Sequence, residues 1–198
     1  MLRSLVGSEM CIRDRSIELF DGRGAKVTRD PRYTALMLAG MQAGSDVGEP
    51  LTRKRPAIIK TIQNYDIHAD IEAALKSGCV TISQGRLGPQ IERSLTTYLT
   101  DNNPILSEIS TYESVLTSLR DLRQALNDQI GRPTTAGQVP LIEARVKARL
   151  AVQQRDGIIK GFANVTLEDL GDQVAVSYDC APVEPLNFIT LTAVAQRI

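Results

Sequence analysis

Hydrophobic positions three or four residues apart predict two helices in the second half of the chain. The first helix has a single apolar stripe at helical period, formed by Val115, Leu119, Leu122, Leu126 and Ile130. We expect it to begin at a capping box, Ser110 to Glu113, and to end at Gly131. The second helix is expected from about Pro140 to Arg155, with four apolar residues facing inward: Leu141, Ile142, Val146 and Leu150.

Alternation of apolar and polar residues predicts a β-hairpin after these helices. Its second strand has apolar residues at a period of two, at Val174, Val176, Tyr178 and Cys180. The expected partner strand runs from Ile158 to Val165, and the loop between them ends at Gly171-Asp172. Beyond Pro182 and Pro185, residues Asn187 to Ala195 have strand propensity, and the two prolines are expected to detach this strand from the hairpin.

A further helix is expected in the first half of the chain. Asp30 and Pro31 suit an N-cap and a first helical position, and Gly44 suits the end of the helix. The residues from Tyr33 to Ala43 are apolar on nearly every side. This composition predicts a buried helix rather than an amphipathic one.

The remaining predicted elements are short. They are an apolar run Ile17–Phe20 before a turn at Asp21–Gly24, a strand around Ile58, Ile59 and Ile62, a helix Asp66–Lys76 stopped by Gly78, and two strands, Cys79–Ser83 and Ile91–Leu99, around a turn at Gly85–Pro89. Because helices are bracketed by strands, the expected fold class is α+β.

Composition and charge narrow the possible functions. The chain has 198 residues, 42% of them hydrophobic, which is enough to bury a sizeable core. The 23 Lys and Arg residues balance 23 Asp and Glu residues. This balance argues against a nucleic-acid binder, since such proteins need an excess of positive charge. The longest apolar run, Ala35 to Met41, has seven residues, so we expect no membrane insertion.

The first fifteen residues, MLRSLVGSEMCIRDR, differ from the rest. The apolar pair Leu5-Val6 is cut short by Gly7, so the stretch lacks the apolar core of a signal peptide. The string resembles a translated sequencing adapter joined to a truncated reading frame, and residues 1–15 are therefore expected to be non-native. The alternative is a native leader without regular structure.

Residues that could carry catalysis or bind metal are few and scattered. Three cysteines, Cys11, Cys79 and Cys180, form no CxxC pair and predict neither a disulfide framework nor a zinc site. The single histidine, His68, lies near Asp66 and Asp70, but a solvated or capping role is favoured because local spacing supplies no converging ligands.

Other candidate motifs also have a simpler explanation. The stretches Asp21–Gly24 and Gly85–Gly88 match neither phosphate-loop pattern and are expected to be turns. The cluster Arg53-Lys54-Arg55 could contact phosphate, although a solvated loop or an inter-subunit charge pair is favoured. The pair Glu168-Asp169 is expected in a turn. We therefore predict a non-enzymatic chain with no catalytic residue, cofactor or metal site.

Three stretches, in this order, resemble the tail sheath proteins of contractile bacteriophages and related injection machines. They are Pro31–Gly44 with Gly48–Lys54; Thr96–Tyr98 with Asp101, Asp121–Arg123 and Ile130–Pro133; and Gly157–Phe162 with Asp172–Tyr178 and Ala181–Ile189. The resemblance covers residues 16–198, and the ordered set is more specific than any one motif. The N-terminal arm and most of the central domain of the family have no counterpart here.

The resemblance implies a domain organisation. Residues 16–60 would be the end of a central α/β domain. Residues 61–185 would form the sheath C-terminal domain, in which a two-helix hairpin packs on a small sheet. Residues 186–198 would form a strand that is exchanged between subunits as an arm, whereas the alternative is a strand that closes the sheet of its own chain.

The resemblance also implies an interface and partners. The arm residues would be Leu186, Asn187, Phe188, Ile189, Thr190, Leu191, Thr192, Ala193 and Val194. The acceptor hairpin would present Ile158, Ile159, Phe162, Val174, Val176 and Tyr178. Expected partners are identical sheath subunits, the tail tube protein, and the baseplate and tail terminator proteins, in a virion tail assembled in the host cytoplasm. The alternatives are the sheath of a phage-derived bacteriocin or other injection system, and a small α/β ligand-binding or enzymatic domain around Gly22 and Gly24.

Overall fold

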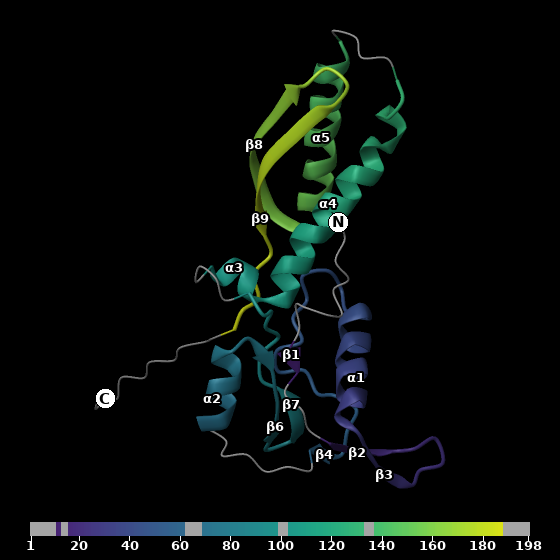
Figure 1. Cartoon of the computed structure of the whole chain (residues 1–198), viewed down its shortest axis with the longest axis vertical. Coiled ribbons are helices and arrows are strands. Elements are labelled where there is room, and N and C mark those ends of the chain that lie inside the picture. Colours follow the sequence, from purple (N-terminus) through teal and green to yellow (C-terminus); the bar gives the residue numbers. More distant parts are fainter. Residues whose placement is uncertain (1–10, 13–15, 62–68, 99–102, 133–136, 188–198) are drawn as a thin grey trace, which may run out of the picture.

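The computed structural model describes residues 11–12, 16–61, 69–98, 103–132 and 137–187 of the 198-residue chain. The described residues form an elongated α+β structure with a hydrophobic cluster in each half (Figure 1). Helix α4, Ile109–Leu126, connects the two halves, since Ile109 belongs to one cluster and Leu122 to the other.

The half that contains α5 is a helix pair covered by a β-hairpin. Helix α5, Gln138–Arg155, lies beside α4, and a short 3₁₀ turn, η1 (Asn127–Gln129), follows α4. Strands β8, Ile159–Asp169, and β9, Val174–Pro182, pair in antiparallel and lie across the helices (Figure 1). The core of this half consists of Leu122, Ile142, Val146, Leu150 and Ile159. The predicted helix pair and hairpin are thus confirmed, with the hairpin longer than expected. Two details are wrong: Leu141, predicted to be inward, is 56% exposed, and the first helix ends at Leu126 rather than at Gly131.

The other half combines small sheets with short helices. Strands β2 (Ile17–Phe20), β3 (Lys26–Arg29) and β4 (Lys60–Thr61) form a sheet in the order β3-β2-β4. Strand β1 (Cys11–Ile12) pairs in parallel with β5 (Cys79–Val80), and β6 (Ile82–Gly85) pairs with β7 (Gly88–Ile91). The helices are α1 (Pro31–Ala43), α2 (Ala69–Lys76) and α3 (Pro104–Ser107).

One hydrophobic core unites residues from both sides of position 60. It contains Ile17, Leu38, Leu51, Ile58, Val80, Ile82, Ile91 and Ile109. At Gly78, which follows α2, the backbone has a φ of +71° and a Cβ would lie 2.5 Å from the carbonyl oxygen of Thr96. Glycine is therefore needed there for both conformation and space. The domain boundaries expected from the sequence stay a prediction.

Helix α1 begins and ends as predicted, but it is not buried on all sides. The Asp30 carboxylate accepts a hydrogen bond from the Arg32 N–H, and Gly44 is the C-cap. The expected burial is wrong, because Tyr33 is 48% exposed and Leu36 is 67% exposed. Helix α1 packs on the core through Leu38, and its opposite face is solvent-exposed in the described part of the chain.

The start and the buried face of α4 also differ from the prediction. The helix begins at Ile109 without a side-chain cap, so the expected capping box is absent, and Glu113 instead accepts a hydrogen bond from Gln42 at 2.6 Å. The buried face includes four small polar residues, Ser110, Thr111, Ser114 and Ser118, together with the apolar Leu122. Leu119 and Ile130, predicted to be inward, are exposed, and Ile130 lies beyond the end of α4.

The strand predicted at Ile91–Leu99 begins earlier. The turn between β6 and β7 is at Arg86-Leu87, and Gly85 pairs with Gly88. The predicted turn at Gly85–Pro89 therefore contains the first half of β7, and the residues after Ile91 form only an isolated bridge between Leu95 and Glu108. Glu168 and Asp169, expected in a turn, end strand β8. None of the helices in the described residues combines the length and apolar character needed to cross a membrane.

Candidate subunit interface

The β8–β9 hairpin is a two-stranded sheet, so each strand has one edge without a ladder partner among the described residues. Its ladder shifts register between Ile159 and Gly161 and again between Ala163 and Thr166. At the second irregularity Asn164 has a φ of +50°, and its side chain donates to Asp179 at 2.5 Å. Unpaired backbone N–H and C=O groups at such an edge can pair with a strand from another chain.

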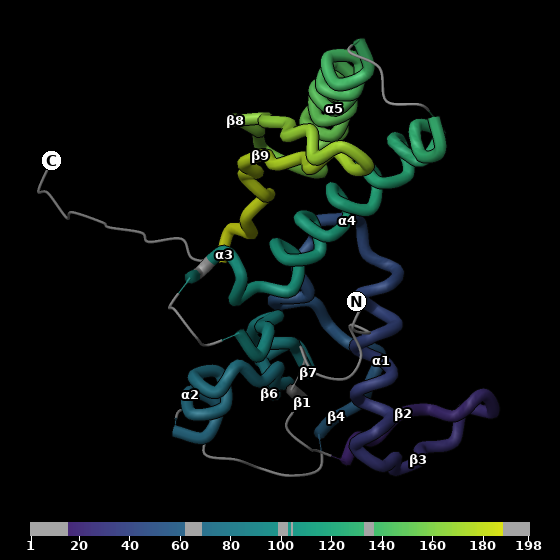
Figure 2. Tube along the Cα trace, turned by 45° about the horizontal axis from the view of Figure 1, so that its top comes forward, coloured from purple at the N-terminus to yellow at the C-terminus, as the bar shows by residue number. Residues whose placement is uncertain are grey.

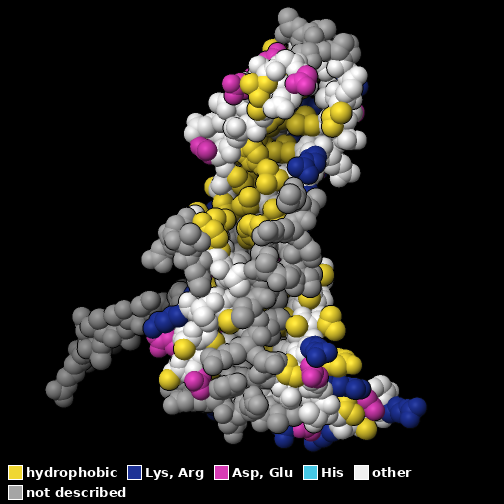
Figure 3. Space-filling model, viewed as in Figure 1, with side chains coloured by type: hydrophobic (Ala, Val, Ile, Leu, Met, Phe, Trp, Pro, Cys, Tyr) yellow, Lys and Arg dark blue, Asp and Glu magenta, His cyan; other side chains and the backbone are white. Residues whose placement is uncertain are grey.

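The six predicted acceptor residues come together on or next to this hairpin. Ile159 is 1% exposed and belongs to the core, so it anchors the hairpin to the two helices. The other five are half-buried and pack against that core: Ile158, Phe162, Val174, Val176 and Tyr178. Figure 3 shows hydrophobic side chains gathered over this part of the surface. These side chains therefore form a partly covered apolar surface under the open two-stranded sheet. We call these six residues the apolar floor.

A hydrogen-bond network fixes this hairpin to the two helices. The Ser118 hydroxyl lies 3.0 Å from the Tyr178 hydroxyl and donates to Gln153 Oε1 at 2.6 Å. Gln153, which is buried, donates in turn to the Ser118 carbonyl at 3.2 Å and to Asp121 Oδ2 at 2.6 Å. Burial raises the pKa of Tyr178, which therefore remains a neutral phenol. The network joins α4, α5 and β9.

Asp121 and Arg149 form a two-point ion pair at the edge of the network. Arg149 Nε donates to Asp121 Oδ2 at 2.7 Å, and a second guanidinium nitrogen donates to Oδ1. These hydrogen bonds lower the pKa of Asp121 below its ordinary value of 3.8. The folded state therefore favours the ionised carboxylate.

This ion pair predicts a dependence of stability on pH. The contribution of Asp121 to the free energy of unfolding is complete above pH 3.8 and is lost as the pH falls through its lower folded-state pKa. We expect Asp121→Asn to reduce that free energy by about 1–3 kcal/mol at pH 7 and by less at pH 3. Urea denaturation from pH 3 to 7 measures both effects. An equal loss at every pH would contradict this assignment.

Residues 182–187, around the two prolines, contact other parts of the chain. Pro182 is the buried last residue of β9 and pairs with Ile159. After it, Glu184 pairs with Lys160 at 3.4 Å, and Asn187 Nδ2 donates to Glu108 Oε1 at 3.0 Å. Strand β9 ends at Pro182, and the detachment of the following strand from the hairpin stays a prediction, because most of that strand lies outside the described residues. Of the predicted arm, Leu186 is 81% exposed, and Phe188–Val194 lie outside the described residues.

Glu108 is the buried anchor of this segment. Its carboxylate also accepts a hydrogen bond from Arg93 and lies directly before α4. Burial raises the pKa of Glu108, and the Arg93 and Asn187 hydrogen bonds oppose that rise. No local sequence pattern indicates this role. Gln153 could have been found, because it continues the buried helical stripe after Val146 and Leu150 at a spacing of three.

The other candidate motifs have structural roles or lie outside the described residues. Arg53 pairs with Glu92, and Lys54 pairs with Glu49, each at 2.9 Å, so both of these basic side chains are held within the chain. Burial raises the pKa of the Cys180 thiol, which disfavours the reactive thiolate. His68 is not among the described residues. Within the described ranges, no group of three or more His, Cys, Asp or Glu residues could hold a metal ion.

A hollow of about 330 Å³ lies where the β8–β9 turn meets the ends of α4 and α5. Its apolar lining includes Leu126, Ile130, Ile142, Val174 and Val176. It adjoins the open hairpin, and polar residues such as Arg132, Gln138 and Asp172 complete its lining.

Comparison with known proteins identifies what this arrangement resembles. No model of a known protein family matches the chain. The tail sheath protein of Bacillus phage SP01 is 28% identical over 162 residues, which is 79% of this chain and 28% of that protein.

Solved structures share the fold. The sheath tail protein of Desulfitobacterium hafniense superposes with a TM-score of 0.72 at 17% identity, over 88% of this chain and 42% of that one. The sheath tail protein of Listeria innocua gives 0.70 at 17% identity, over 88% and 43%. The helical sheath of the anti-feeding prophage in its contracted state gives 0.68 at 14% identity, over 92% and 54%.

The chain thus spans less than a third of the length of the curated relative and about half of the length of these solved structures. The two kinds of similarity agree, and they confirm the expected resemblance. In sequence and in fold, this chain resembles part of a contractile tail sheath protein.

Proposed function

We propose that this chain is part of a structural, non-enzymatic subunit of a contractile sheath, which polymerises around a tail tube and contracts to drive the tube through a host envelope. The observation that carries the proposal is an open β8–β9 hairpin in a fold shared with sheath proteins from a contracted sheath. Partners would be identical subunits, the tube protein, and the baseplate and terminator proteins. The location would be a virion tail assembled in the host cytoplasm.

Strand exchange would join the subunits. Residues 186–198 of one copy would form an arm that adds to an edge of the β8–β9 hairpin in another copy. The open edges, the half-buried apolar floor and the exposed Leu186 support this arrangement. A strand added to an edge gains roughly 4–6 ladder hydrogen bonds, each worth about 1 kcal/mol net. The arm could stay bound while subunits rotate, because the link at residues 183–187 has no helix or strand and can absorb the motion.

The proposal extends to the sheath of a bacteriocin or other injection system. The structural relatives include the sheath of an extracellular contractile injection system in its contracted state, at a TM-score of 0.66 and 14% identity. The proposal does not extend to an enzymatic domain around Gly22 and Gly24. Those glycines close the projecting β2–β3 hairpin, far from the apolar hollow beside β9 (Figure 2).

Hydrogen exchange with a peptide added in trans tests the arm. We expect the peptide of residues 186–198 to bind a chain that ends at Asn187 and to slow amide exchange in β8 or β9. Exchange in α1 serves as the internal reference. The matched control peptide carries Ile189→Pro and Leu191→Pro, which removes two backbone donors. Unchanged exchange in the hairpin, or equal protection by both peptides, would contradict the strand-exchange proposal.

A further inference from the structure

Positive charge is concentrated on the β2–β3 hairpin, which projects beside the start of α1 (Figure 2). Three exposed basic residues share this hairpin: Arg23, Lys26 and Arg29. Two carboxylates of the same hairpin have partners within the chain. Glu18 pairs with Lys60 at 3.1 Å, and Asp21 accepts two backbone N–H groups of its own turn at 2.8 Å. The hairpin therefore presents net positive charge to its surroundings.

Negative charge is concentrated on the β8–β9 hairpin. Three exposed carboxylates lie at its turn: Glu168, Asp169 and Asp172. Residues 157–187 contain one Lys and five Asp or Glu residues, whereas residues 16–60 contain eight Lys or Arg and five Asp or Glu residues.

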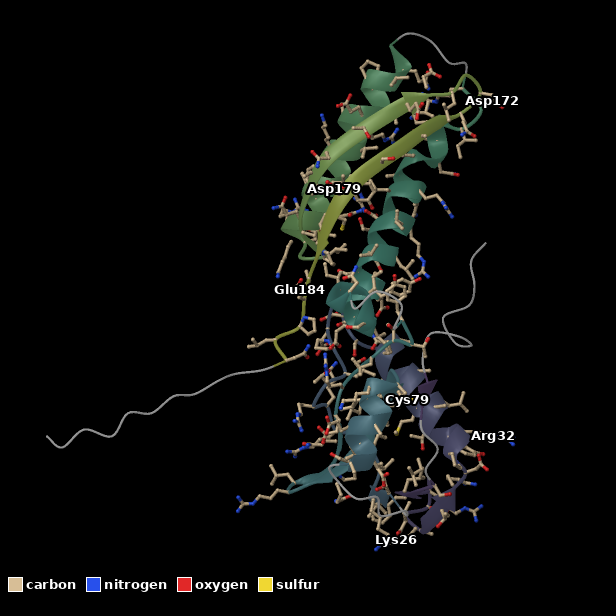
Figure 4. The ribbon with its side chains drawn as sticks, turned by 60° about the vertical axis from the view of Figure 1, so that its left-hand side comes forward. Lys26, Arg32, Cys79, Asp172, Asp179 and Glu184 are labelled. Carbon is tan, nitrogen blue, oxygen red and sulfur yellow. The ribbon has the colours of Figure 1, made fainter. Side chains whose placement is uncertain are left out.

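These two charged surfaces lie at opposite ends of the molecule. Figure 4 shows Asp172 at one end and Lys26 at the other, and Figure 3 shows the basic side chains gathered over the region of β2 and β3. The chain is neutral overall, but its charge is unevenly distributed along its long axis.

We propose that the β2–β3 hairpin of one copy binds the β8–β9 turn of a second copy through these opposite charges. The contact joins two different surfaces, so each copy can bind two neighbours, and the contacts build a ring or a helix rather than a closed pair. The inference rests on the proposed function, since it names one contact between the copies of a polymer.

Charge complementarity within one chain favours a second copy over an unrelated partner. A nucleic acid or an anionic membrane would complement the basic hairpin alone and would leave the acidic one without a partner. Exposed ion pairs are individually weak and are screened by salt. The contact therefore sets the orientation and the rate of association, whereas the apolar arm supplies most of the affinity.

Charge reversal tests the contact in the full 198-residue chain. The basic-end variant carries Arg23→Glu, Lys26→Glu and Arg29→Glu, and the acidic-end variant carries Glu168→Lys, Asp169→Lys and Asp172→Lys. The matched control reverses three other exposed arginines, Arg86→Glu, Arg120→Glu and Arg123→Glu, and changes the net charge by the same amount as the basic-end variant. Sedimentation velocity over a concentration series at 25 and 300 mM NaCl measures self-association, and circular dichroism verifies folding.

We expect the wild-type chain and the control to self-associate at low salt. Each end variant should associate at least about tenfold more weakly. An equimolar mixture of the two end variants should restore association, because each then meets an opposite charge. A wild-type chain that stays monomeric at low salt, or a mixture that fails to restore association, would overturn the proposal. So would binding of duplex DNA or anionic vesicles by the basic hairpin without self-association.

The outcomes also separate this contact from the proposed arm. If association survives both charge reversals but is lost when residues 188–198 are removed, the charge contact is wrong and the sheath proposal stands. If charge reversal abolishes association and removal of those residues does not, the arm is wrong and the charge contact stands.

Discussion

A chain that ends at Asn187 is expected to remain folded and to lose self-association. The residues removed lie beyond the last anchor of the C-terminal segment, the hydrogen bond from Asn187 to Glu108 at 3.0 Å. Both hydrophobic cores and the β8–β9 ladder lie entirely within the residues retained. The midpoint of thermal unfolding should therefore change by no more than about 2 °C, which corresponds to about 0.5–1 kcal/mol for a chain of this size. Sedimentation velocity should detect only monomers at concentrations at which the 198-residue chain forms oligomers.

A matched control separates the arm from the anchor. Asn187→Ala in the full-length chain removes the hydrogen bond to Glu108 and keeps residues 188–198 of the arm. We expect it to weaken association less than the truncation does, because the arm can still pair with an open edge. A truncated chain that unfolds would show that the segment belongs to its own globule. A truncated chain that assembles as well as the full-length chain would eliminate the arm.

Local sequence signals predicted the ends of several elements correctly. Asp30, Pro31 and Gly44 delimit α1 as expected, since a side-chain cap, a fixed φ and a glycine act within a few residues. The alternation from Val174 to Cys180 predicted β9 because one face of a hairpin lies on the helices. These features depend on chemistry that a short window of sequence contains.

The buried faces of the helices were less predictable. The hydrophobic stripe of α4 indicated Leu119 and Ile130 as inward residues, yet the helix buries Ser114 and Ser118. Ser114 donates to the Ile158 carbonyl, and Ser118 donates to Gln153, so tertiary partners satisfy both hydroxyls. Those partners lie 44 and 35 residues away, and no local pattern identifies them.

The same limit applies to the candidate interface. The acceptor residues were identified through the resemblance and through strand alternation, and the structure places them on one hairpin. The anchor formed by Glu108 and Asn187 was missed, because it depends on a contact across 79 residues. The two prolines predicted a strand detached from the hairpin, and they gave no indication of the one ion pair and the one hydrogen bond that connect Glu184 and Asn187 to the rest of the chain.

Replacing Gln153 by Leu is expected to destabilise strongly the half formed by the helix pair and hairpin. Gln153 is 1% exposed and makes three hydrogen bonds, with the Ser118 hydroxyl, the Ser118 carbonyl and Asp121. Leucine has a similar volume but leaves these groups without their partner. Each buried group left unsatisfied costs about 1–3 kcal/mol, so we expect the free energy of unfolding to fall by about 2–4 kcal/mol.

The neighbouring residue offers a matched control. Gln154 is exposed on the same helix, and Gln154→Leu should change the free energy of unfolding by less than about 0.5 kcal/mol. Urea denaturation of both variants at pH 7 measures the difference. A double variant, Ser118→Ala with Gln153→Leu, should lose less than the sum of the two single losses, since the hydroxyl and the amide serve each other. Equal effects of Gln153→Leu and Gln154→Leu would show that the polar network contributes little to joining α4, α5 and β9, and that apolar contacts alone hold the hairpin in place.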